Sequence, residues 1–503
     1  MNILLGYLLM LITLGGFGYI GYRSAKGKEV SSDDFLAARG SQDWLKIGLS
    51  LFASGMGIWL LFGPSEVGYY GGFWDVTGYA ISSATPFLLL AFIGPMIRRK
   101  LPDGVTLADY VRMRIGRPMQ IYVGIISILY MFTFLFAEFT AVGKAMAILA
   151  GMTPLIPIIF VALVTAAYTA YGGLPASLQT DRWQAWLALW LIIVLLLFIF
   201  AGDFASMMES AKAYNPDDAW SIGSISHISK ASFLSGLAII IAITAAEMFS
   251  QGNWQRAYAS EDDAALKKGA LFAAALVLPL VFIMGVLGTV VAGQGAASDP
   301  SSAFFLLIAD ANVLIIASFV VLGIALVCSS ADTLQNAIVA SISRDLADGR
   351  LDLKQARMAS MALIPIAVGL AVWGATNATS VFAIFLFADL LATATVLPVL
   401  LPLWDKIDSR ASLAGAISGL LAVIVYGTIT EDIMAGIGYI FSPTNEWKLA
   451  NLNVFLSALL VSGFVTIALS FVLPSDPTGG SSEQQDQPSV ELSVEAAPEP
   501  IKE

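Results

Sequence analysis

The sequence has little of the chemistry from which enzyme active sites are built. Its 503 residues include one cysteine, Cys328, and one histidine, His227. A single cysteine excludes an intramolecular disulfide. The single histidine lies in a predicted external loop, which excludes a histidine-based catalytic centre or a histidine proton relay within a membrane. There is also no ATP-binding cassette motif and no phosphate-binding glycine loop. We therefore expect neither an enzyme nor transport driven by ATP hydrolysis.

Charged residues are scarce, and long apolar runs take their place. Charged residues make up 13% of the chain and hydrophobic residues 57%. Apolar stretches of about 20 residues, each long enough to cross a hydrocarbon core of roughly 30 Å, recur along the sequence. The sequence predicts an all-α integral membrane protein with thirteen transmembrane helices. Their approximate ranges are 3–22, 44–70, 73–97, 119–147, 153–171, 183–202, 231–253, 268–293, 311–343, 358–375, 379–403, 411–440 and 449–473.

The distribution of basic residues predicts the orientation of these spans. The first span has no basic stretch ahead of it and no convincing cleavage site, and the basic residues of Arg23–Lys28 follow it. Most of the 26 lysines and arginines then fall in predicted cytoplasmic segments, and only Lys212, Lys230 and Lys448 fall in external ones. We expect a plasma-membrane protein, in a bacterium the inner membrane, with its N-terminus outside and its C-terminus in the cytoplasm.

The chain divides into a transmembrane body, residues 1–474, and a tail, residues 475–503. The tail is rich in Ser, Gln, Pro and Glu, and it carries a large share of the formal charge of −11. Such a segment cannot bury a core, so we expect a disordered acidic cytoplasmic extension. The expected partners are the lipid bilayer and a small-molecule solute, without nucleic acid. We expect a monomer or a weak homo-oligomer.

Two predicted spans are interrupted at comparable places. In the second span Gly55 and Gly57 flank Met56, and the seventh span ends in the irregular stretch 250–253. If residues 43–203 and 230–404 are two five-helix repeats, each break lies in the first helix of its repeat. Paired interruptions of this kind indicate a transporter whose site lies at the repeat interface, because unwound backbone exposes carbonyl groups to cations. The alternative is that the glycines only allow helices to pack closely.

A polar cluster lies within the apolar run 311–343. It consists of Ser329, Ser330 and Asp332. An ionisable group at such a depth usually lines an ion or substrate path. Two hydroxyls can converge on one cation if a neighbouring helix supplies further oxygens. The alternative is that the serines bond to carbonyls of their own helix or join two helices.

Four stretches of the sequence carry a family resemblance. They are FASGMGIWLLFG at 52–63, YGGLPASLQTDRWQ at 171–184, GNWQRAYAS at 252–260 and CSSADTLQNAIVASISRDL at 328–346. With them the chain resembles the sodium:solute symporter family over spans 1–11, and it is most similar to the urea and polyamine branch. The resemblance implies two inverted five-helix repeats, spans 2–6 and 7–11, with discontinuous first helices. One extra helix precedes this core and two follow it.

The resemblance also implies a sodium site, with sodium as the coupling ion. Its ligands would be the main-chain carbonyls of Ala53, Met56 and Leu326 and the hydroxyls of Ser329 and Ser330. Sodium is a hard cation that prefers oxygen ligands, and neutral oxygens bind it without an excess of buried negative charge.

A second ion or a proton path is implied by Asp181, Asp332 and Thr333. In the family Asp181 lies on the cytoplasmic side of the sodium site. Asp332 stands where members usually have a small hydroxyl or apolar residue, and Gly55 where many have an aspartate. If Asp332 faces Asp181, the carboxylates could hold a second sodium or share a proton, so proton coupling stays open. Alternatively, Asp181 caps a helix N-terminus and Asp332 bonds a loop near the cytoplasmic end.

The substrate cavity implied by the resemblance is formed by the broken helices with spans 3 and 11. Its candidate residues are Trp59, Glu66, Trp74, Asp75, Glu247, Gln251, Asn253, Phe385 and Asp389. Another acid, Glu138, should face the bundle interior. Aromatic walls with a few polar groups suit a small polar organic solute. Acidic groups without an obvious buried arginine disfavour an anion.

The expected activity is sodium-coupled symport by alternating access, with urea or a related small amide or amine as the solute. Proton coupling and a proline, sugar or monocarboxylate substrate remain alternatives within the family. A membrane sensor built on a transporter fold is the alternative from another class, but it predicts an appended signalling domain. The short acidic tail is not such a domain.

Overall fold

A computed structural model describes most of the chain. The described residues are 1–27, 31–201, 206, 209, 230–294, 299–309, 311–348, 350–377, 379–404 and 407–473. His227 and the predicted tail, 475–503, lie outside them.

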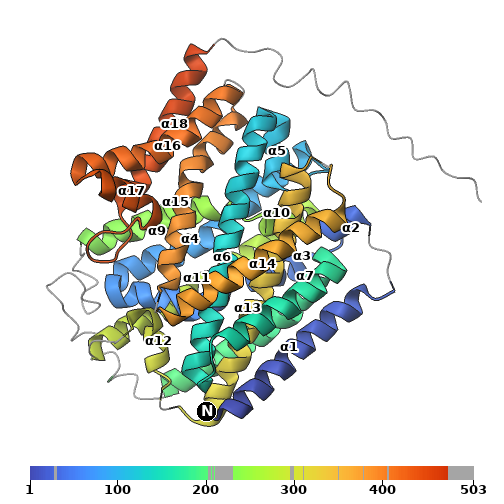
Figure 1. The fold of residues 1–503 in the computed structure, drawn as a ribbon, viewed down its shortest axis with the longest axis vertical. Helices are drawn as coiled ribbons and strands as arrows, with labels where there is room; N and C mark the ends of the chain where they lie inside the picture. The colour runs from blue at the N-terminus through green and yellow to red at the C-terminus, as the bar shows by residue number, and fades with distance from the viewer. Residues whose placement is uncertain are drawn as a thin grey trace, which may run out of the picture.

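The described part of the chain is helical, and eleven of its helices are long and apolar enough to cross a membrane. Isolated β-bridges are its only extended pairings. The elements (Figure 1) are α1 (Ile3–Ala25), α2 (Ser32–Leu36), α3 (Trp44–Gly55), η1 (Ile58–Leu61), α4 (Gly63–Lys100), α5 (Leu107–Ile115), α6 (Arg117–Ala150), α7 (Leu155–Ala201), α9 (Lys230–Glu247), α10 (Gln251–Ala259), α11 (Asp263–Gln294), η2 (Pro300–Ser302), α12 (Ala303–Leu306), α13 (Val313–Ala340), η3 (Ser341–Leu346), α14 (Leu353–Thr376), α15 (Val381–Leu400), η4 (Leu401–Leu403), α16 (Ser409–Thr430), α17 (Ile433–Phe441) and α18 (Leu452–Val472).

Two of these helices contain a sharp kink at a glycine. Helix α4 has 38 residues and leaves helical geometry at Gly72, with φ +62°. Helix α7 has 47 residues and does the same at Gly173, with φ +58°. At about 1.5 Å per residue, α4 is roughly 57 Å long and α7 roughly 70 Å, which exceeds one crossing of a bilayer. Each kink separates two of the predicted spans, although the count of thirteen stays a prediction.

Both predicted helix breaks are present, but the second lies at 248–250, and residues 251–253 of the predicted irregular stretch are helical. Helix α3 ends at Gly55 and the short helix η1 begins at Ile58, while α9 ends at Glu247 and α10 begins at Gln251. Glycine at the first break lets Glu138 approach the backbone, because a Cβ atom at Gly57 would lie 2.3 Å from both carboxylate oxygens of Glu138 and would displace them. The discontinuous helices are therefore a property of the fold.

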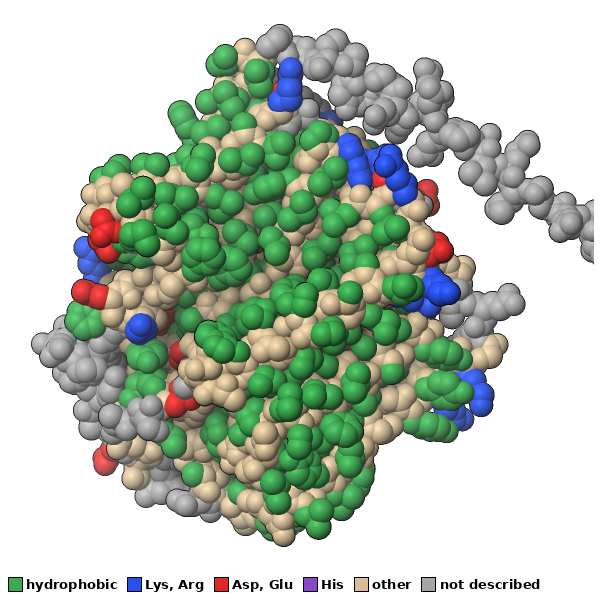
Figure 2. Space-filling model, viewed as in Figure 1, with side chains coloured by type: hydrophobic (Ala, Val, Ile, Leu, Met, Phe, Trp, Pro, Cys, Tyr) green, Lys and Arg blue, Asp and Glu red, His purple; other side chains and the backbone are tan. Residues whose placement is uncertain are grey.

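The packing places the breaks in the interior. Helix α1 lies along one side of the bundle against α7 and α13, and α16 to α18 lie at the opposite end (Figure 1). Helix α13 packs against α3 and also against α6. On the face shown in Figure 2, hydrophobic side chains cover the middle, and charged side chains gather at two opposite edges. Such a surface suits a protein surrounded by lipid.

Candidate functional site

The residues expected to bind sodium lie on two helices that pack against each other. Ala53 and Met56 are at the end of α3, and Leu326, Ser329 and Ser330 are on α13. All five residues are buried. Because α3 ends at Gly55, the carbonyls of its last turn lack the hydrogen bonds of a continuing helix. Carbonyl and hydroxyl oxygens therefore occur together at the first break.

Both serine hydroxyls donate to a buried carboxylate. Ser329 Oγ lies 2.6 Å from Asp181 Oδ1, and Ser330 Oγ lies 2.6 Å from Glu138 Oε2. Ser330 Oγ is also 3.3 Å from the carbonyl oxygen of Leu326. Two oxygens at that separation can share one hard cation, whose ligands lie at about 2.3–2.6 Å. The alternative for the serine pair was a hydrogen bond to a carbonyl of the same helix. Ser330 makes that contact with Leu326, but its contact with Glu138 on α6 is shorter.

Glu138 joins α6 to the break itself. Its Oε2 accepts the backbone N–H of Ile58 at 2.9 Å, and its Oε1 accepts the N–H of Trp59 at 3.1 Å. The side chain is fully buried, as expected for an acid facing the bundle interior. Sequence reasoning did not connect Glu138 with the serine pair, because α6 carries no break or motif that would indicate it.

Asp181 is paired with a buried arginine that the sequence analysis missed. Arg256 Nη2 lies 2.6 Å from Asp181 Oδ2, and both side chains are fully buried. The guanidinium also donates to Thr333 Oγ1 at 2.7 Å and, through Nε, to Ser50 Oγ at 2.7 Å. The expectation that the bundle has no buried arginine is therefore wrong. The feature of the sequence that could have indicated this arginine is the position of Arg256, three residues after the stretch 250–253.

Asp332 has a different set of partners. It accepts hydrogen bonds from Tyr168 at 2.5 Å, Ser177 at 2.7 Å and Thr180 at 3.1 Å, all on α7. Its alternative role as a loop cap is wrong, because the side chain is buried between α13 and α7. The alternative of an N-cap at Asp181 is also wrong, since Asp181 lies well inside α7.

The guanidinium of Arg256 lies between the two aspartates. It contacts Asp181 directly, and it reaches Ser177 at 3.4 Å and Thr333, both of which donate to Asp332. A second cation between the carboxylates would therefore compete with a positive charge that belongs to the protein.

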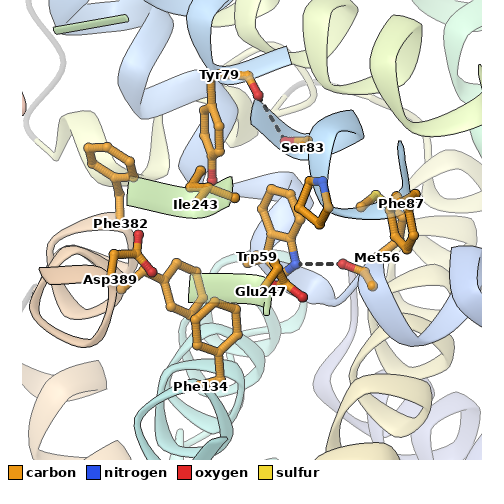
Figure 3. A pocket seen from close by; sticks show the side chains of 13 residues that line it. Met56, Trp59, Tyr79, Ser83, Phe87, Phe134, Ile243, Glu247, Phe382 and Asp389 are labelled. Atoms are coloured by element: carbon orange, nitrogen blue, oxygen red, sulfur yellow. Dashed lines mark hydrogen bonds between the residues drawn. The ribbon is translucent and has the colours of Figure 1, made fainter. Parts of the chain in front are cut away.

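A cavity opens beside the first break (Figure 3). Four of the nine predicted substrate residues line it: Trp59, Glu247, Phe385 and Asp389. The remaining lining residues are Gly55, Met56, Tyr79, Ser83, Pro86, Phe87, Phe134, Ile243 and Phe382. Helices α4 and α6 thus supply aromatic walls that the sequence did not single out, because their apolar faces resemble ordinary core.

Two carboxylates and several aromatic rings define the chemistry of this cavity. Glu247 accepts hydrogen bonds from Tyr130 at 2.7 Å and from Asn253 at 3.0 Å. Asp389 Oδ1 is buried and has no hydrogen-bond partner in the described part of the chain. The rings of Phe134 and Phe385 stack with centroids 4.2 Å apart. Figure 3 shows Asp389, Glu247 and Phe134 approaching one region from three helices.

The other five predicted substrate residues do not line the cavity. Asn253 instead supports Glu247, and Gln251 bonds the backbone of Leu107 and the side chain of Ser127. The remaining three, Glu66, Trp74 and Asp75, contact Ser380, Phe233 and Ser235 respectively. In this structure the side chains of these five residues contact neighbouring helices and loops, and their contact with a substrate stays a prediction.

Comparisons with known proteins agree with this architecture. The solved structure of a sodium-coupled sialic acid symporter in a substrate-bound outward-open state covers 93% of this chain and 98% of its own, with a TM-score of 0.71 at 14% sequence identity. The structure of Mhp1, a nucleobase-cation-symport-1 family transporter, covers 91% of this chain and 100% of its own, with a TM-score of 0.53 at 13% identity. At these identities the likeness concerns the fold, which is that of LeuT-type transporters.

Sequence comparisons identify the family. The spermidine transporter DUR31 of Candida albicans is 31% identical over 411 residues, which are 79% of this chain and 76% of that protein. A sodium/glucose cotransporter of Vibrio parahaemolyticus is 24% identical over 310 residues, covering 57% of this chain and about half, 54%, of the cotransporter. The profile of the sodium:solute symporter family matches residues 35–421. The chain therefore belongs to the sodium:solute symporter family.

Proposed function

We propose that this protein is a sodium-coupled symporter that imports a small cationic amine by alternating access. The observation that carries the proposal is the pair of buried carboxylates, Glu247 and Asp389, in an aromatic cavity. Among the described residues that line this cavity there is no lysine or arginine to balance them. A buried carboxylate is costly without a cationic or hydrogen-bonding partner, so a protonated amine would satisfy both charge and hydrogen bonding.

The aromatic walls favour the same class of solute. The ring of Trp59 stacks with that of Tyr79 at 5.9 Å and meets Phe385 edge-on at 6.5 Å. Aromatic faces attract ammonium groups within about 6 Å of the ring centroid. The similarity to a spermidine transporter supports a polyamine or a related amine. Urea, the narrower expectation from the sequence, fits less well because a neutral molecule leaves the two charges unbalanced.

The proposed ion site and the cavity share the first break. Met56 lines the cavity, and its carbonyl is a proposed sodium ligand together with Ala53, Leu326, Ser329 and Ser330. Sodium that orders the break would therefore raise the affinity for the solute, and by linkage the solute would raise the affinity for sodium. Asp181, Asp332 and Thr333, with Arg256 among them, would form the cytoplasmic side of the ion path. The proposed orientation in the plasma membrane has the N-terminus outside.

Uptake into proteoliposomes tests the function directly. Spermidine, putrescine, urea, proline, glucose and a monocarboxylate would be offered under separate sodium and proton gradients. We expect accumulation of an amine under the sodium gradient alone. Accumulation under the proton gradient alone would replace sodium by a proton. Amine binding without accumulation under either gradient would contradict symport and favour a sensor.

Replacing Ser329 by alanine is expected to raise the sodium concentration for half-maximal uptake by about 10- to 100-fold. The change removes one proposed ligand oxygen together with its hydrogen bond to Asp181, and a hydrogen bond to a charged group contributes about 1.5–3 kcal/mol. Sodium titration of initial uptake rates measures the effect. Ser318→Ala is the matched control, because that hydroxyl bonds its own helix at Leu314 O. An unchanged sodium dependence in Ser329→Ala would remove Ser329 from the site.

A further inference from the structure

We propose that Glu138 is a positioning residue of the ion site, which orients Ser330 toward sodium and supplies the negative charge that sodium balances. The proposal rests on the sodium-coupled function above. Glu138 lies on α6, outside the helices that carry the five proposed ligands. Its carboxylate contacts Ser330 at 2.6 Å and two backbone N–H groups of the break.

Glu138 fixes the direction of the Ser330 hydroxyl proton. A hydroxyl that ligates a cation offers a lone pair, so its proton has to point to another acceptor. Ser330 donates to Glu138 Oε2, which leaves its lone pairs free beside the Leu326 carbonyl, 3.3 Å away. Ser329 has the equivalent acceptor in Asp181 Oδ1. Groups that orient metal ligands through such hydrogen bonds typically change metal affinity by about 10- to 100-fold when mutated.

Asp181 and Glu138 differ in how their negative charges are balanced. The carboxylate of Asp181 is neutralised by Arg256 at 2.6 Å. Glu138 differs, because its hydrogen-bond donors are neutral: one hydroxyl and the N–H groups of Ile58 and Trp59. Within the described residues no lysine or arginine forms an ion pair with Glu138. Glu138 therefore brings to the ion site a negative charge that no cationic side chain pairs with, and a monovalent cation would balance it.

Glu138 also connects the ion site to the cavity. Its carboxylate accepts a hydrogen bond from the backbone N–H of Trp59, and the Trp59 ring lines the cavity. The carboxylate fits against the backbone because residue 57 is glycine, where a Cβ atom would lie 2.3 Å from it. If sodium binding moves the Ser330 hydroxyl, the side chain of Glu138 would transmit that movement to Trp59 in the aromatic wall of the cavity. Glu138 is consequently placed to couple ion occupancy to solute binding.

Equilibrium binding of ²²Na⁺ to the purified protein tests the proposal. In Glu138→Gln, which keeps an acceptor oxygen but removes the charge, we expect the sodium dissociation constant to rise about 10- to 100-fold. Glu138→Asp keeps the charge and should recover part of the affinity. The maximal uptake rate at saturating sodium should fall less than the affinity does. Thermal unfolding of each variant separates this effect from a loss of structure.

A double-mutant cycle adds specificity. Glu138→Gln and Ser330→Ala should be strongly non-additive in sodium affinity, because they affect one hydrogen bond, whereas Glu138→Gln and Ser329→Ala share only the ion and should show a smaller coupling energy. Ser330→Ala alone keeps the test decisive should the Glu138 variants not fold: wild-type sodium affinity in it would overturn the proposal. Wild-type affinity in a folded Glu138→Gln protein would do the same.

The result for the unmodified protein separates this inference from the proposed function. Sodium binding that is weakened by Glu138→Gln, without amine uptake by the wild type, would support the role of Glu138 and contradict only the assigned solute. If the wild-type protein binds no ²²Na⁺ at all, sodium coupling fails, and the role of Glu138 fails with it.

Discussion

Glu247→Gln and Asp389→Asn, made separately, are expected to lower the uptake efficiency for a cationic amine by about 30- to 4,000-fold. Each change removes one carboxylate charge from a buried cavity. Among the described residues that line this cavity there is no lysine or arginine. Breaking a buried charge pair typically costs about 2–5 kcal/mol, and about 1.4 kcal/mol corresponds to a factor of ten. The concentration dependence of initial spermidine uptake into proteoliposomes measures the effect.

Two comparisons give this prediction its specificity. Glu261→Gln alters an exposed glutamate close to α10 and should leave uptake within a factor of about two. Binding of a neutral solute such as urea should be much less sensitive than binding of the amine, because only the amine loses an ion pair. Wild-type amine uptake in both cavity variants would show that these carboxylates do not bind the solute.

Arg256→Met is expected to lower the free energy of unfolding by about 3–5 kcal/mol. The substitution leaves Asp181 buried without its cationic partner, and removing one member of a buried ion pair is strongly destabilising for that reason. It also leaves the hydroxyls of Ser50 and Thr333 without a donor. Denaturant unfolding of the purified protein in mixed micelles measures the loss.

The double variant Arg256→Met with Asp181→Asn distinguishes charge from packing. Removing both charges should recover a large part of the lost stability, since the cost arises mainly from the unpaired carboxylate. Arg99→Met serves as the matched control, because the Arg99 side chain is 68% exposed and should contribute less than about 0.5 kcal/mol. A double variant no more stable than Arg256→Met would mean that the guanidinium acts mainly by filling space.

The ion site and the solute cavity are held by the same short stretch of irregular backbone. Gly55 and Met56 line the cavity, while Ile58 and Trp59 donate their backbone N–H groups to Glu138. A helix that continued through this point would have used those N–H groups in its own hydrogen bonds. The break therefore serves both ligands at once, which is the physical basis for the proposed coupling.

Much of the fold was determined by local features of the sequence. Hydropathy located the membrane helices, because about 20 apolar residues are needed to cross a bilayer wherever they occur. The glycines at 55 and 57 located the first helix break, and the stretch 250–253 located the second to within a few residues, since backbone preferences act over a few residues. The serine pair was found by its contrast with an apolar helix. Family resemblance then supplied the helices that surround it.

The partners of these residues were decided by tertiary structure alone. Ser330 and Glu138 are 192 residues apart, and Arg256 and Asp181 are 75 apart. Neither pair has a spacing or motif that predicts contact, because a residue on an apolar helix can face lipid, core or cavity at the same hydropathy. Helix rotation and packing decided that Glu247 and Asp389 face the cavity while Glu66 and Asp75 do not. The sequence by itself thus determined where the helices run and break, and only their packing determined which buried charges meet.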